Sequence, residues 1–146
     1  VKIGSPFMSF FYFEALMKVG GTQAMLDDIR REWGGMIDND ATTCWETFPG
    51  FQKDRLARSH CHAWSAAPGY FLGAYVLGVR PLQPGFKRVL IDPNPCGLEW
   101  ARGSVPVPGG RIDIRWENNK GSIKVWVKGP DYIQYEYGDK IKVELL

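Results

Sequence analysis

The chain has 146 residues, and 45% of them are hydrophobic, which is enough to bury the core of an ordinary globular domain. Its 18 basic and 16 acidic residues are scattered and leave a formal charge of +2, without the basic stripe that binds a phosphate backbone. The sequence therefore predicts a folded protein that does not bind nucleic acid. The apolar stretches are all interrupted well before the roughly 20 residues that a membrane span needs, so no membrane partner is predicted.

The first predicted element is a helix with a recognisable cap. Ser5 fits the N-cap position and Pro6 the first helical position, where its missing N–H costs nothing. Residues 7–19 are apolar on nearly every side, and Gly20 and Gly21 follow as a helix end. A helix of this kind is expected to have protein on most of its sides.

Two more helices are predicted before residue 80. The second helix begins at Thr22 and is amphipathic, with a charged face opposite an apolar stripe. The stripe consists of Met25, Leu26, Ile29 and Trp33. The third helix is rich in small residues and spans residues 63–77, with Pro68 in its first turn or at a kink. This alternation of apolar and amphipathic helices is typical of one part of a helical toroid.

The hydrophobic period changes after two prolines and a glycine in residues 79–85, so we place a domain boundary between residues 80 and 81. Five short runs separated by turn clusters are predicted to be strands, which favours an antiparallel β-sandwich over residues 81–146. The runs are residues 86–91, 98–102, 110–116, 122–127 and 141–145.

An irregular segment between the second and third helices concentrates three carboxylates, those of Asp38, Asp40 and Glu46. Loops on a rigid scaffold often carry catalytic groups, and glycoside hydrolysis needs two carboxyl groups beside the scissile bond. Glu46, flanked by aromatic residues, is the best candidate for one of the pair. The alternative is that all three are solvated or helix-capping residues, because acids are common in loops.

Histidine and cysteine residues give no clear metal signature. The chain has an odd number of widely spaced cysteines, Cys44, Cys61 and Cys96, and this pattern indicates neither a disulfide framework nor a zinc module. The cysteines are therefore compatible with any cellular compartment. His60 and His62 are the only histidines, so they cannot complete a zinc ligand set, and neither a metal nor another cofactor is predicted. Each histidine fits a hydrogen bond to a sugar hydroxyl or a carboxylate, or else a capping or packing role.

Four strings of residues, taken together and in this order, resemble the C-terminal part of bacterial α-L-rhamnosidases of glycoside hydrolase family seventy-eight. They are TTCWE at residues 42–46, SHCHAWSAAP at 59–68, YVLGVRP at 75–81 and LEWARGSVP at 98–106. The resemblance implies an α+β architecture in two segments: the last helices of an (α/α)6 barrel over residues 1–80, followed by the C-terminal β-sandwich. It also implies inverting hydrolysis of terminal α-L-rhamnose from glycosides, flavonoids or polysaccharides.

The resemblance also implies roles for individual residues. The glutamate of the Thr-Thr-x-Trp-Glu string is the family's general base and falls on Glu46, and the histidine before Ala-Trp-Ser, which binds the sugar or the base, falls on His62. Trp45 and Trp64 are placed in the substrate-binding wall by proximity. The family carries its general acid on earlier barrel helices, which have no counterpart here. We therefore expect the chain to begin partway through a longer bacterial protein, to need the rest of the parent polypeptide and to be inactive alone on its carbohydrate substrate.

Two other interpretations stay open. In one, the chain is a non-catalytic carbohydrate-binding or structural module, with an aromatic platform on the β-domain from Trp100, Trp116, Trp126 or Tyr135. Because the tryptophans alternate with polar residues, we predict core packing for them instead. In the other, the chain belongs to a glycosidase on the same barrel that acts on another sugar.

Overall fold

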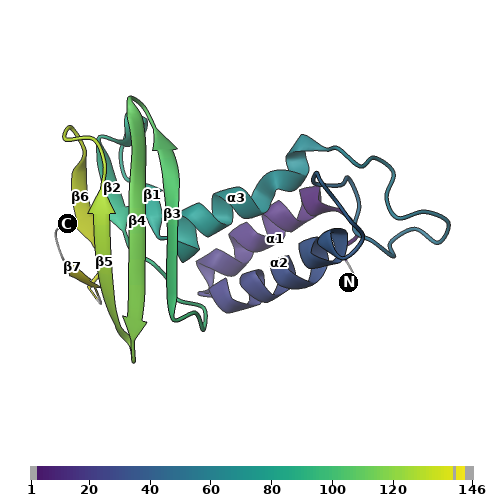
Figure 1. Ribbon diagram of the computed structural model, residues 1–146, viewed down its shortest axis with the longest axis horizontal. Helices are drawn as coiled ribbons and strands as arrows, with labels where there is room; N and C mark the ends of the chain where they lie inside the picture. Colours follow the sequence, from purple (N-terminus) through teal and green to yellow (C-terminus); the bar gives the residue numbers. More distant parts are fainter. Residues whose placement is uncertain (1–2, 140, 144–146) are drawn as a thin grey trace. The chain divides into compact units, whose positions relative to one another are not determined.

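The computed structural model describes residues 3–139 and 141–143, and the chain divides into two compact units, Val1–Phe71 and Leu72–Leu146. The first unit is helical and the second is built of strands, as the labels in Figure 1 show. The predicted domain boundary after residue 80 stays a prediction. None of the described helices is long and apolar enough to cross a membrane.

Helix α1 spans Pro6–Lys18 and begins as the sequence predicts. Ser5 has extended backbone geometry, and its Oγ accepts a hydrogen bond from the backbone N–H of Phe7, which would otherwise lack a helical partner. Pro6 occupies the first helical position. After the helix, Gly20 takes a φ of 74°, and the N–H of Gly21 bonds back to a carbonyl of the last turn.

One side of α1 is covered and the other is open. Ser9 and Phe13 are 4% and 1% exposed, and Phe13 packs edge-on against Phe71 with ring centroids 5.3 Å apart. Other apolar residues of the same helix are between 37% and 54% exposed, namely Phe7, Met8, Phe11 and Tyr12. The described residues therefore provide only part of the surroundings that this largely apolar helix is expected to have.

Helix α2 spans Thr22–Ile37 and runs antiparallel to α1, as Figure 1 shows. Three of the four residues of its predicted stripe are buried, because Met25, Leu26 and Trp33 are each less than 9% exposed, whereas Ile29 is half-buried. The indole N–H of Trp33 donates to the backbone carbonyl of Ser65 at 2.8 Å, which satisfies two buried polar groups at once.

The third predicted helix is three short helical pieces. A 3₁₀ turn, η1 (Ala63–Ala66), leads into α3 (Ala67–Phe71), and a π-helical turn, η2 (Leu72–Val76), follows. Pro68 lies in the first turn of α3, one of the two positions predicted for it, where it has no helical hydrogen bond to lose. Sequence periodicity alone did not predict the change to π geometry, which is rare in proteins.

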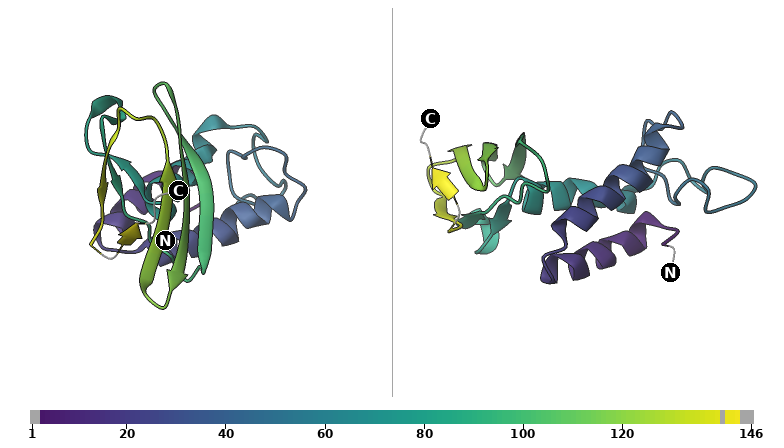
Figure 2. Two further views of the ribbon diagram at one scale, coloured as in Figure 1. Left: turned by 60° about the vertical axis from the view of Figure 1, so that its left-hand side comes forward. Right: turned by 90° about the horizontal axis from the view of Figure 1, so that it is seen from below.

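The second unit contains two sheets, which lie as two layers in Figure 2. The smaller sheet has the order β1-β2-β6, formed by Val79–Pro81, Arg88–Ile91 and Gln134–Tyr137. The larger sheet has the order β3-β4-β5-β7. Its strands are Trp100–Val107, Gly110–Asn119, Ser122–Lys128 and Ile141–Val143, and residues 144 and 145 of the last predicted run lie outside the described residues.

The prediction of a purely antiparallel sandwich was wrong in two pairings. Strands β2 and β6 are parallel, and so are β5 and β7. Parallel neighbours need a long crossover connection, and here each crossover visits the other sheet. The chain forms β3, β4 and β5 between β2 and β6, and it forms β6 between β5 and β7. Short-range patterns do not reveal such pairings.

The core of the second unit lies on the inner faces of the sheets. Trp116, Ile112 and Val125 are fully buried in the larger sheet, and Val89 and Ile91 in the smaller one. The indole N–H of Trp116 donates to the backbone carbonyl of Val76 at 2.9 Å. Core packing is therefore confirmed for Trp116.

Core packing was wrong for Trp100, which is 57% exposed, and for Trp126, which is only half-buried and lies beneath the guanidinium of Arg115. Trp100 lies opposite Glu117 in the pairing of β3 with β4, whereas Trp116 lies opposite Ala101. Because side chains alternate along a strand, Trp100 and Trp116 belong to opposite faces of the same sheet.

Candidate functional site

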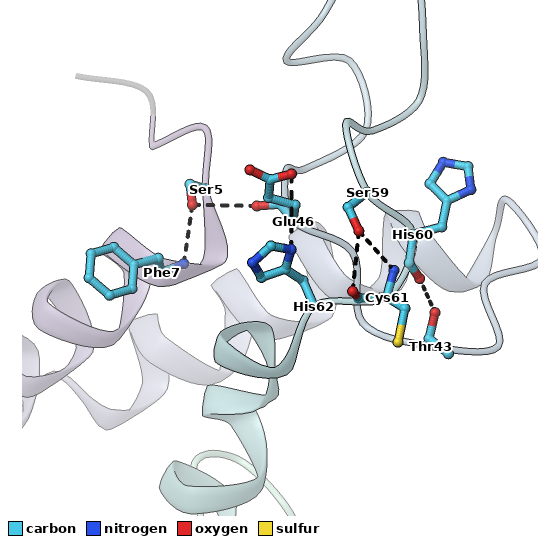
Figure 3. A network of polar contacts seen from close by, with 8 residues as sticks. All are labelled: Ser5, Phe7, Thr43, Glu46, Ser59, His60, Cys61 and His62. Carbon is cyan, nitrogen blue, oxygen red and sulfur yellow. Dashed lines mark hydrogen bonds and ion pairs between the residues drawn. The ribbon is translucent and has the colours of Figure 1, made fainter.

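Two backbone hydrogen bonds bring the predicted site residues together within the helical unit. The N–H of Glu46 donates to the carbonyl of Ser59 at 2.9 Å, and the N–H of His62 donates to the carbonyl of Cys44 at 2.9 Å. The two segments therefore run antiparallel and close the long loop between them, as Figure 3 shows. Loop residues gain a fixed geometry in this way without belonging to a helix or sheet.

The side chains of Glu46 and His62 face each other in Figure 3. Oε2 of Glu46 lies 4.0 Å from Nδ1 of His62, and the side chains are 20% and 28% exposed. This distance is too long for a hydrogen bond and gives an ion pair only when the imidazole is protonated. Among the described residues, Nδ1 of His62 is buried without a hydrogen-bond partner. A ligand hydroxyl placed between the two groups would give both of them a partner.

Ser5 links this pair to the first turn of α1. Its Oγ donates to the backbone carbonyl of Glu46 at 3.4 Å and accepts from the N–H of Phe7 at 3.3 Å. Figure 3 shows both hydrogen bonds meeting at the Ser5 hydroxyl. The helix cap therefore also holds the backbone of the candidate base. Ser5 was predicted only as a cap, because a contact between positions so far apart in the chain leaves no mark in the local pattern.

The two predicted tryptophans have different surroundings. Trp64 is 47% exposed, and its ring lies 3.9 Å from that of His62 and 5.3 Å from that of Phe7. Trp45 is 3% exposed, and its ring stacks on His60 at 4.6 Å. Trp64 thus borders the Glu46–His62 pair at the surface, whereas Trp45 is buried against His60. Their contacts with substrate stay predictions.

The other acidic residues of the segment have ordinary roles. Asp38 is an exposed C-cap residue of α2, and Asp40 is exposed with a φ of 59°. Asp tolerates this left-handed geometry better than most residues do. Glu46 is thus the partly buried carboxylate of the three. Within the described part of the chain, no three His, Cys, Asp or Glu side chains are grouped as a metal site requires.

Family models match nearly all of the chain outside its ends. Residues 2–76 match the bacterial α-L-rhamnosidase six-hairpin glycosidase domain, and residues 78–133 match the bacterial α-L-rhamnosidase C-terminal domain. The first match alone covers more than half of the 146 residues.

Individual relatives agree with these matches. The crystal structure of the glycoside hydrolase family seventy-eight rhamnosidase of Bacillus sp. GL1 is 51% identical, with a TM-score of 0.88 over 98% of this chain and 16% of that one. An α-L-rhamnosidase of Alteromonas sp. (strain LOR) is 30% identical over 92% of this chain and 15% of its own length. An α-L-rhamnosidase of Streptomyces avermitilis is 26% identical over 77% of this chain and 13% of its own length.

The chain thus spans about 15% of the length of the relatives that it matches. The helices and the mixed sheets correspond to the end of their helical barrel and to their β-domain, so the predicted fold class is confirmed apart from the parallel pairings. No closed barrel is formed by the described residues themselves. The chain belongs to the bacterial α-L-rhamnosidase family, of which it carries the end of the six-hairpin glycosidase domain and the C-terminal domain.

Proposed function

We propose that this chain supplies the general base, Glu46, to an inverting α-L-rhamnosidase whose general acid lies elsewhere in the parent polypeptide. The observation that carries the proposal is the carboxylate of Glu46, which is 20% exposed and faces the unpartnered Nδ1 of His62. No hydrogen bond from any described residue reaches this carboxylate, so its lone pairs can accept a proton from water.

The proposed reaction is a single displacement. The carboxylate of Glu46 takes a proton from a water molecule, and the water oxygen forms a bond to the anomeric carbon. The bond from that carbon to the leaving oxygen breaks on the opposite side, and the general acid gives this oxygen a proton. The two carboxyl groups of such a pair are roughly 6.5–9.5 Å apart, which leaves room for the water. The sugar is released with inverted configuration.

His62 and Trp64 would hold the sugar beside the base. His62 offers a ring nitrogen to a sugar hydroxyl, and its position 4.0 Å from Glu46 places that hydroxyl within reach of both groups. Trp64 is exposed next to His62 and can pack against the apolar face of the ring. Trp45, which is 3% exposed, would support the backbone of the segment that carries Glu46.

The parent polypeptide would complete the site. Residues 1–80 would form the last helices of the barrel and residues 81–146 the C-terminal β-domain. Earlier barrel helices would cover the open apolar side of α1, where Met8 and Phe11 are 53% and 54% exposed. The substrate class, terminal α-L-rhamnose on a glycoside or polysaccharide, is supported by the names of the relatives.

The proposal is tested on the full-length protein with a chromogenic α-L-rhamnoside, followed by proton NMR. We expect rapid hydrolysis and β-L-rhamnose as the first anomer formed, before mutarotation. First formation of the α anomer would rule out the inverting mechanism. Hydrolysis of other chromogenic glycosides in place of the rhamnoside would support the same barrel with a different sugar.

A further inference from the structure

The outer face of the larger sheet carries a patterned set of side chains. Strand pairing places Trp100 opposite Glu117 and Arg102 opposite Arg115, and Arg115 is in turn opposite Trp126. Since these positions alternate with the buried ones, all of them point away from the core. Two tryptophans thus share this face with two arginines.

A cleft of about 660 Å³ opens at one end of this face. Its walls include one indole, several charged groups and two amides. The lining residues include Trp100, Arg102, Arg115, Glu117, Asn118 and Asn119. A volume of this size holds one or two sugar rings, because small-molecule sites usually enclose about 300–1,000 Å³.

The indole of Trp100 and the guanidinium of Arg102 both line the cleft and are available to a ligand. Trp100 is 57% exposed, and in the described part of the chain no ring or cation is recorded over its indole. Arg102 likewise takes part in no ion pair among residues 3–139 and 141–143. Trp126 differs, because the guanidinium of Arg115 and the ammonium of Lys124 each lie 5.3 Å from its ring centroid.

We propose that this cleft is a second saccharide-binding site, in which one pyranose ring of an oligosaccharide stacks on Trp100. The indole offers a flat apolar face to the C–H groups of the ring. Arg102 presents a planar fork of donors to ring hydroxyls or to a uronate carboxylate. Glu117 contributes acceptors, and Asn119 both a donor pair and an acceptor, to the remaining hydroxyls.

The composition of the cleft favours a sugar over a docked protein segment. The cores of protein interfaces are depleted of acidic residues, whereas this cleft contains two, Glu99 and Glu117. Arg115 and Glu117 form an ion pair at the surface. A polar wall beside one exposed indole matches a hydroxyl-rich ring.

This site is independent of Glu46, and its proposed role is to hold the polysaccharide rather than to cleave it. The test uses the full-length protein carrying Glu46→Gln and isothermal titration calorimetry with a rhamnogalacturonan tetrasaccharide. We expect Trp100→Ala and Arg102→Ala, each added to this background, to remove one binding event or to weaken it at least tenfold. Trp100→Phe, which keeps a smaller ring, should weaken it less.

Leu82→Ala is the matched control, because Leu82 is an exposed apolar residue of the same unit that does not line the cleft. Its isotherm should equal that of the background protein, and thermal melting should show that all variants are folded. An isotherm that neither Trp100→Ala nor Arg102→Ala changes would overturn the proposal and leave the face as a contact for other parts of the protein. Residual hydrolysis by Glu46→Gln would contradict the proposed base and not this site.

Discussion

Oε2 of Glu46 and Nδ1 of His62 lie 4.0 Å apart, and backbone hydrogen bonds rather than a direct bond between the side chains hold them there. The carbonyl of Cys44 fixes the N–H of His62, and the carbonyl of Ser59 fixes the N–H of Glu46. The two side chains are thus pre-positioned without consuming the groups that would act on a substrate. Such an arrangement would keep the proposed base and the proposed sugar-binding group in place at no cost in side-chain hydrogen bonds.

His62→Ala is predicted to lower kcat/KM of the full-length protein on an α-L-rhamnoside by about 10²-fold, because the sugar loses its register against Glu46. Steady-state kinetics measures the effect. His60→Gln is the control, since His60 is exposed and its ring stacks on Trp45 instead of facing Glu46. An equal loss in both variants would show that the segment, and not the imidazole of His62, is responsible.

Ser5→Ala is predicted to destabilise α1 by about 1 kcal/mol, because the N–H of Phe7 loses its cap. Chemical denaturation measures this change. Ser5→Asp retains an acceptor for Phe7 but has no hydroxyl to donate to the carbonyl of Glu46. We therefore expect Ser5→Asp to restore stability but not full activity, and Ser5→Thr to restore both. Full activity in Ser5→Asp would show that the bond to Glu46 is dispensable.

Trp116→Phe is predicted to cost about 1–3 kcal/mol of unfolding free energy, because the buried carbonyl of Val76 loses its donor. Trp126→Phe changes the same residue type on the outer face and should stay within about 0.5 kcal/mol. Comparing the two denaturation midpoints tests the assignment of inner and outer faces. Similar losses in both variants would contradict it.

The features that depend on neighbouring residues were predictable. Ser5 and Pro6 indicate the start of α1, and the hydrophobic periodicity of residues 22–37 predicts the amphipathic character of α2. Alternation along β3 and β4 shows that Trp100 and Trp116 lie on opposite faces, but it does not say which face is inward. That choice is made by packing on the second sheet, and Trp100 was assigned to the wrong side.

Features that depend on distant residues were not predictable from periodicity. The parallel pairs β2–β6 and β5–β7 arise because the chain crosses between sheets, which local hydrophobic patterns do not encode. The closeness of Glu46 and His62 was expected from the family resemblance. Residue spacing alone does not predict contacts across the intervening loop. The bond from Ser5 to Glu46 was missed for the same reason.

The most direct test of the account compares Glu46→Gln with wild type on two substrates. The first is 2,4-dinitrophenyl α-L-rhamnoside, which has a good leaving group, and the second is methyl α-L-rhamnoside, which has a poor one. A general base assists the attack of water on both substrates, whereas a general acid matters mainly for the poor leaving group. We predict that kcat falls by about 10²–10⁴-fold on both substrates. Asp40→Asn, which changes an exposed carboxylate of the same segment, should leave kcat unchanged. Near-normal kcat in a folded Glu46→Gln variant, or a loss confined to the methyl glycoside, would contradict the assignment of Glu46 as the base.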